Sequence, residues 1–222
     1  MGHFFSEDNP VFALLGRLTD MVIVSVLWLV LCLPVITAGA SSSALYYAVT
    51  KSLRHRRGYI SREFFRGFRS CLKQSTLIWL IYAAAALLTV ADIRIMQLSQ
   101  GNAAAFMRFL FGVLMLCLTI WLTWALAYVA RFKLPLRGVM KNAALMAIRH
   151  LPSSLLILAV AVCAVLILYM MPFLLIIVPA LKALLDSLVL ERVFLRYMTD
   201  EDRRMEEMRN HPENFEYVNR NE

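Results

Sequence analysis

The chain lacks the common arrangements of catalytic residues. Its 222 residues contain no HExxH pair, no phosphate-binding glycine-rich loop, no Ser/His/Asp grouping and no paired acidic cluster in the basic connections. His150 has no Cys, His or carboxylate near it at ligand spacing, which argues against a metal site. We therefore expect a non-enzyme with no catalytic residues, no cofactor and no metal.

Paired cysteines and a cleavable signal are missing as well. The four cysteines form no CxxC pair and three lie inside apolar runs, so we expect them to be reduced, small apolar side chains. The first apolar run follows Glu7, Asp8 and Asp20 rather than a basic region, which is not the pattern of a cleavable signal peptide.

Long apolar runs, by contrast, dominate the chain. Hydrophobic residues make up 60% of it and the mean hydropathy is +0.66, beyond the range of an ordinary soluble domain. We predict an all-α fold, a polytopic transmembrane helical bundle of about five spans. We interpret residues 1–199 as a single transmembrane domain and residues 200–222 as a charged cytoplasmic tail. The predicted spans are residues 20–37, 76–96, 104–130, 154–171 and 173–190.

The last apolar stretch allows a second topology. Residues 155–190 are too long for one span and long enough for two short spans with a turn at Met171-Pro172. The alternative has four spans, the last ending near Pro179. Residues 181–197 would then form an amphipathic surface helix, and the C-terminus would lie outside.

The stretch from Lys51 to Lys73 carries eight Lys or Arg residues and one acid, Glu63. At helical spacing its second half has an aromatic face opposite a basic face. Such a helix suits a headgroup layer, with rings in the acyl boundary and cations on anionic phosphates. Docking of a cytoplasmic partner is the alternative, and nucleic acid is not expected as a partner. The candidate lipid or partner contacts are Arg62, Arg66, Arg69 and Lys73.

A second basic connection sets the predicted topology together with the first. Residues 131–152 contain five Lys or Arg residues and no acid. Short basic loops stay cytoplasmic, so we expect residues 51–73 and 131–152 to lie inside. With five spans, the N-terminus would lie outside and the C-terminus in the cytoplasm.

Two further features lie within the apolar part. Residues 37–44 are small, and such a run lets backbones approach closely, so we expect it to pack under a neighbouring helix; a bend that contacts a ligand is the alternative. Lys182 and Asp186 lie four residues apart on one face of the last predicted span. Charges at that depth are costly unless paired, so we interpret them as an intramembrane polar pair, with a substrate or ion contact as the alternative.

The first 74 residues contain an ordered set of short motifs. The set comprises Asp8-Asn9-Pro10, Arg17-Leu18, Leu27-Trp28-Leu29, Leu33-Pro34, Ala44-Leu45-Tyr46-Tyr47, Gly58-Tyr59-Ile60, Phe64-Phe65 and Lys73-Gln74. In this the chain resembles the YesL-like bacterial membrane proteins, known as the domain of unknown function 624. It departs from their pattern at Gly39-Ala40, where Gly-Pro is frequent. The resemblance implies a bacterial plasma membrane protein, often associated with carbohydrate uptake systems of the ATP-binding-cassette type, and it implies no activity.

Three functions follow in order of preference. The first is a non-enzymatic accessory or regulatory protein working beside a sugar transporter of the ATP-binding-cassette type. The second is a small transporter or permease subunit. Leu151-Pro152 resembles part of the cytoplasmic loop that couples such a subunit to its ATPase, but the Glu-Ala-Ala part of that loop is absent. A membrane enzyme comes last.

Overall fold

The computed structural model describes residues 10–54, 59–98, 101–132 and 134–197. All regular elements in these ranges are helices, which confirms the all-α prediction. The predicted tail, residues 200–222, lies outside the described residues. The elements are α1 (Pro10–Cys32), η2 (Val35–Thr37), α2 (Ala38–Ala48), η3 (Val49–Arg54), α3 (Ile60–Leu98), α4 (Asn102–Arg131), α5 (Leu136–Arg149), α6 (Leu151–Met170), η4 (Pro172–Ile176) and α7 (Val178–Tyr197).

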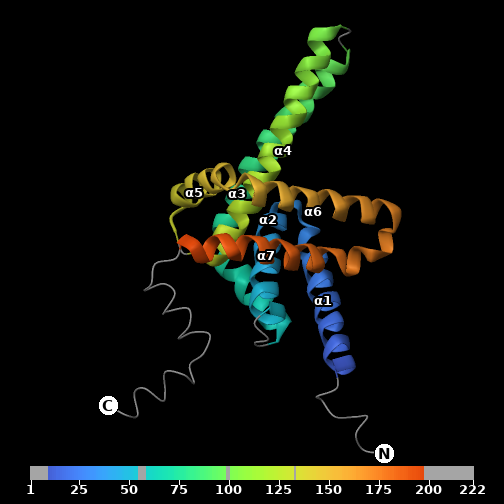
Figure 1. Cartoon of the computed structure of the whole chain (residues 1–222), viewed down its shortest axis with the longest axis vertical. Coiled ribbons are helices and arrows are strands. Elements are labelled where there is room, and N and C mark those ends of the chain that lie inside the picture. The colour runs from blue at the N-terminus through green and yellow to red at the C-terminus, as the bar shows by residue number, and fades with distance from the viewer. Residues whose placement is uncertain (1–9, 55–58, 99–100, 133, 198–222) are drawn as a thin grey trace, which may run out of the picture.

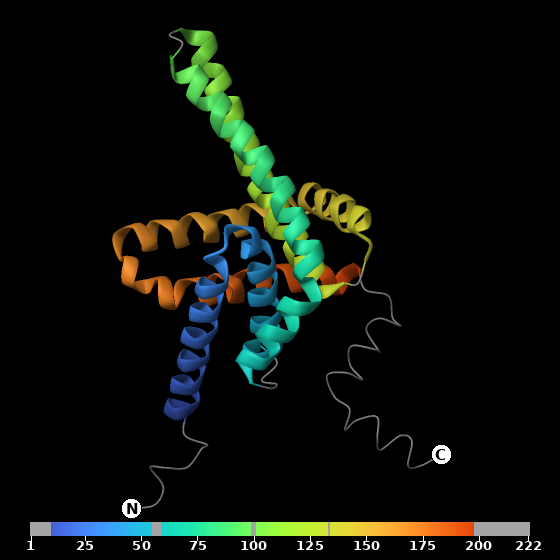
Figure 2. The ribbon, with the colours of Figure 1, turned by 180° about the vertical axis from the view of Figure 1, so that it is seen from behind.

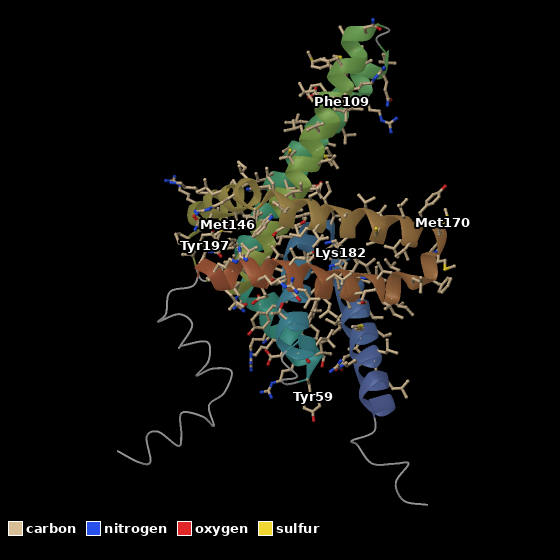
Figure 3. The ribbon with its side chains drawn as sticks, in the orientation of Figure 1. Tyr59, Phe109, Met146, Met170, Lys182 and Tyr197 are labelled. Carbon is tan, nitrogen blue, oxygen red and sulfur yellow. The ribbon has the colours of Figure 1, made fainter. Side chains whose placement is uncertain are left out.

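The longest feature is the antiparallel hairpin of α3 and α4 (Figure 1). Its turn contains Gly101, whose φ of 135° suits a residue without a Cβ. The half of the hairpin near this turn projects away from the other helices, and Figure 3 shows Phe109 on it. Leu87, Leu98 and Phe109 are each about 70–86% exposed there. This apolar surface is suited to lipid contact.

The first helices form a second, shorter hairpin. Pro34 ends α1, and the hydroxyl of Thr37 donates to the carbonyls of Leu31 (2.7 Å) and Pro34 (2.9 Å). α2 then runs back antiparallel to α1 (Figures 1 and 2). The first turn of α1 therefore lies at the same end of the molecule as Tyr59, at the start of α3 (Figure 3). The sequence-based topology had put these two segments on opposite sides, because it did not include the return of α2.

The small residues of α2 pack against α3, as the sequence predicted. A Cβ built on Gly39 would lie 2.6 Å from the carbonyl oxygen of Ser75 and would also meet Trp79. One turn further, the hydroxyls of Ser43 and Ser75 are 2.7 Å apart. Ser43 also donates to the carbonyl of Leu126 in α4 at 3.1 Å. Small side chains thus allow α2, α3 and α4 to meet closely.

α6 and α7 form a third hairpin, which runs across the direction of α3 and α4 (Figures 1 and 2). Within the described residues, four helices are long and apolar enough to cross a membrane: Leu15–Cys32, Ile60–Leu98, Asn102–Arg131 and Leu151–Met170. These support a multi-pass membrane protein.

The predicted fifth span, residues 173–190, is not among them. Its place is taken by η4 and by α7, whose 20 residues include five charged ones, Lys182, Asp186, Glu191, Arg192 and Arg196. The long fourth span of the alternative topology is also not seen, because α6 ends at Met170.

Candidate functional site

A cavity of about 1130 Å³ lies where the two basic connections meet. Its walls come from the end of α2 and from η3, from α3 near its start, and from the end of α4 with the residues that follow it. α7 contributes Glu191. Segments far apart in the sequence therefore build one site at the basic end of the α3–α4 hairpin.

Cations dominate the charged lining. Arg66, Arg69 and Lys73 follow one another at three- and four-residue spacing, which puts them on the same face of α3. Lys51 from η3 and Arg131 from the end of α4 complete five cationic side chains, against one carboxylate in the lining. The cavity therefore has an excess of positive charge.

Behind this lining, the buried carboxylate of Glu63 binds two of the cations. Its Oε2 lies 2.8 Å from Nζ of Lys51, and its Oε1 lies 3.0 Å from Nη1 of Arg66. Lys51 also donates to the hydroxyl of Tyr47 at 3.4 Å. Glu63 thus fixes two cations beside the cavity while its own charge stays out of the lining.

The second carboxylate ties α7 to the rest of the site. Oε2 of Glu191 lies 3.1 Å from Nη1 of Arg131, and the hydroxyl of Tyr46 donates to Oε1 at 3.3 Å. Glu191 is 2% exposed. A buried ion pair is maintained only where both charges have partners, and this one joins α2, α4 and α7.

The cavity wall also holds a buried hydroxyl that has no partner within the described part of the chain. Thr50 lines the cavity and is only 7% exposed. Its Oγ1 has no hydrogen-bond partner among the described residues. Buried polar groups are nearly always hydrogen-bonded, so an orphaned hydroxyl in a cavity wall calls for an explanation.

The four predicted lipid or partner contacts are all exposed, but they divide into two sets. Arg66, Arg69 and Lys73 line the cavity, whereas Arg62 lies outside the lining.

The aromatic face opposite these cations was predicted to enter lipid. Phe64, however, is fully buried against residues of α1, α2, η3 and α7, and Phe65 is 45% exposed. Packing within the protein replaces the predicted lipid contact at Phe64, because η3 and α2 cover that side of α3.

Lys182 and Asp186 do form an ion pair, through Nζ and Oδ2, within α7. Figure 3 shows Lys182 on this helix, near its start at Val178. Asp186 is 4% exposed, and its Oδ1 has no partner among the described residues. Neither residue lines the cavity.

Sequence reasoning did not identify Thr50, Glu63, Arg131 and Glu191 as members of one site. The only signal for Glu63 was its place as the single acid among eight bases. Glu191 stands at the start of a mixed-charge segment that gave no sign of burial. In the described part of the chain, no three His, Cys, Asp or Glu residues are grouped so that they could hold a metal ion.

Comparison with known families was informative for the first part of the chain. Residues 21–93 match the family described as "Protein of unknown function, DUF624". Comparisons with curated proteins and with solved structures give no match. The family match covers the α2, η3 and α3 walls of the cavity, whereas Arg131 and Glu191 lie beyond it. Residues 21–93 are therefore similar to the domain of unknown function 624, as the motifs in the first third of the chain predict.

Proposed function

We propose that this protein is a non-enzymatic accessory or regulatory component of a bacterial plasma membrane, and that it binds its partner through the basic end of the α3–α4 hairpin. The observation that carries the proposal is a single cavity that is lined by Lys51 and by Arg66, Arg69 and Lys73 from the first basic connection, and by Arg131 at the start of the second. Anionic headgroups and acidic protein surfaces are the chemistry that such an end attracts. A carbohydrate transporter of the ATP-binding-cassette type is the partner that the resemblance suggests.

The basic end is proposed to face the cytoplasm. Two short basic connections at one end of a transmembrane hairpin fit the positive-inside rule better than any arrangement that separates them. Because α1 begins at this same end, we place the start of α1 in the cytoplasm too, in place of the predicted outside position. α7 brings Glu191 to the same site, which supports a cytoplasmic C-terminal segment.

A small transporter remains the second candidate. It is favoured by Asp186, a buried carboxylate with one oxygen unpartnered among the described residues. Its ion pair with Lys182 lies within a single helix, whereas transporter sites are usually assembled between broken helices. The accessory function therefore has the better support.

The test is affinity capture from mildly solubilised native membranes. The wild type is compared with a variant in which Arg62, Arg66 and Arg69 are changed to Gln. A matched control removes three exposed cations elsewhere, at Arg17, Arg94 and Arg192. The proposal expects a transporter subunit to copurify with the wild type and the control, and to be lost from the first variant. Purification of all three proteins without any partner would contradict it.

A further inference from the structure

We propose that the cavity between η3, α3 and the end of α4 binds a phosphate-bearing anion, held by Arg69, Lys73 and the hydroxyl of Thr50. This inference goes beyond the proposed function, because it assigns a small ligand rather than a protein partner. It depends on residues that meet only in the folded chain.

The cations of the cavity are not equally available. Lys51 and Arg66 are bound to Glu63 (2.8 and 3.0 Å), and Arg131 is bound to Glu191 (3.1 Å). Arg69 and Lys73 have no acidic partner among the described residues, although both line the same wall. Among the described residues, counting both carboxylates against all five cations leaves three positive charges in excess. An anion in the cavity would balance this excess.

The buried hydroxyl gives independent support. Three buried side-chain oxygen atoms lack a partner in the described part of the chain, and they belong to Thr50, Thr76 and Asp186. Only Thr50 lines the cavity. An unmade hydrogen bond of this kind costs roughly 1–3 kcal/mol, and an acceptor oxygen on a ligand would satisfy it.

The lining also indicates which chemical groups the anionic ligand carries. Arginine presents a planar fork of N–H donors that matches phosphate oxygens, and lysine adds a compact charge. Tyr47, Phe132 and Leu134 supply aromatic and apolar surface in the same cavity. The volume of about 1130 Å³ admits a phosphate with a neutral or apolar remainder. The headgroup of an anionic phospholipid and a soluble phosphate monoester both have this chemistry.

The experiment is titration calorimetry on the full chain, purified in a neutral detergent. Short-chain phosphatidylglycerol tests the headgroup source, and glycerol 3-phosphate tests the soluble source. Short-chain phosphatidylcholine and glycerol are the comparators without net negative charge. We expect one of the two anions to bind, and to bind more weakly as salt rises, because screening weakens exposed charge contacts.

The variants locate the site. Arg69→Gln and Lys73→Gln should each weaken anion binding about tenfold, as expected for a lost charge-assisted hydrogen bond. Arg94→Gln, at the far end of the hairpin, should leave the Kd unchanged. Thr50→Val should weaken binding roughly fivefold while leaving thermal stability equal or higher, since it removes an unsatisfied hydroxyl. Thr76→Val removes an equally orphaned hydroxyl outside the cavity and should leave the Kd unchanged.

Three results would overturn the proposal: binding of neither anion, equal binding of the comparators, or binding by the Arg69, Lys73 and Thr50 variants at wild-type strength. Each is measured on the purified protein without a partner. If the anion-binding proposal fails, the partner proposal is therefore still decided by the affinity capture alone.

Discussion

At the scale of residues, the buried carboxylates explain how so many cations are held together. Glu63 binds Lys51 and Arg66, whose side chains are 28% and 53% exposed. Glu191 instead binds Arg131, whose side chain is only 12% exposed. Because Arg131 and Glu191 are both largely shielded from water, removing one member of this pair should destabilise the fold more than removing Glu63 from its two cations.

We predict that Glu191→Gln lowers the free energy of unfolding in detergent by about 3 kcal/mol, because the largely buried guanidinium of Arg131 loses its ion pair with this carboxylate. Glu63→Gln should cost only about 1 kcal/mol, since its cations reach water. The double variant Arg131→Met with Glu191→Gln should recover part of the loss. Additive destabilisation by the two changes, measured by chemical unfolding, would show that the pair is not coupled.

His150 offers a prediction about pH. Its Nε2 lies 2.8 Å from the hydroxyl of Tyr197, a hydrogen bond between the start of α6 and the end of α7. Partial burial, followed by the charges of Arg149 and Arg196, lowers the pKa of His150 below its usual 6.5. The folded state then binds fewer protons than the unfolded state just below pH 6.5, so stability falls as pH drops from 6.5 towards the folded pKa.

The measurement is an NMR titration of the His150 ring. The wild type should titrate below 6.5, and Arg196→Gln should move the pKa of His150 up towards that value. Arg94→Gln, on the far part of α3, serves as the control and should leave it unchanged. A wild-type pKa at or above 6.5 contradicts this account.

At the scale of elements, close packing of α2 on α3 supports the cavity wall. Gly39 is the tightest point, because an added Cβ would meet Trp79 and the carbonyl oxygen of Ser75. Gly39→Ala should therefore lower the free energy of unfolding by about 1–3 kcal/mol, as in an overpacked core. Gly112→Ala, with nothing within 4 Å of the added Cβ, should change it by less than about 0.5 kcal/mol. Equal effects of the two substitutions in unfolding experiments would show that α2 and α3 can separate freely.

Local patterns predicted much of this element-level structure. Apolar runs and their basic flanks located α3, α4 and α6, and the small residues around Gly39 indicated the close approach of α2. The sequence did not predict that α2 runs back alongside α1, because its eleven residues are too few to be recognised as a membrane span. Residues 173–190 are not among the candidate spans, because α7 begins only at Val178 and continues past Glu191 and Arg192.

The cavity itself was beyond sequence reasoning, because its contacts join distant segments. Tyr46 and Glu191 are 145 positions apart, and Gln74 reaches the carbonyl of Leu134 across 60. Periodicity describes the face of one helix and carries no information about which helix covers it. The basic face of α3 was therefore predicted, whereas its partners from α4 and α7 were not.

At the scale of the whole molecule, the start of α3 lies at one end of the α3–α4 hairpin and the turn at Gly101 lies at the other, while α5 lies beside the middle of the hairpin (Figure 1). Lipid contact along the projecting half and charge at the opposite end give the protein a defined orientation. The proposed partner contact and the proposed anion site both depend on this orientation.

The most direct measurement is labelling of intact cells with a membrane-impermeant maleimide. Single cysteines are placed at Arg62, Lys141 and Asn102 in a variant without the four native cysteines. The account predicts that Asn102→Cys reacts in intact cells, whereas Arg62→Cys and Lys141→Cys react only after the membrane is opened. Reaction of Arg62→Cys and Lys141→Cys from opposite sides, or of all three from the same side, would contradict it.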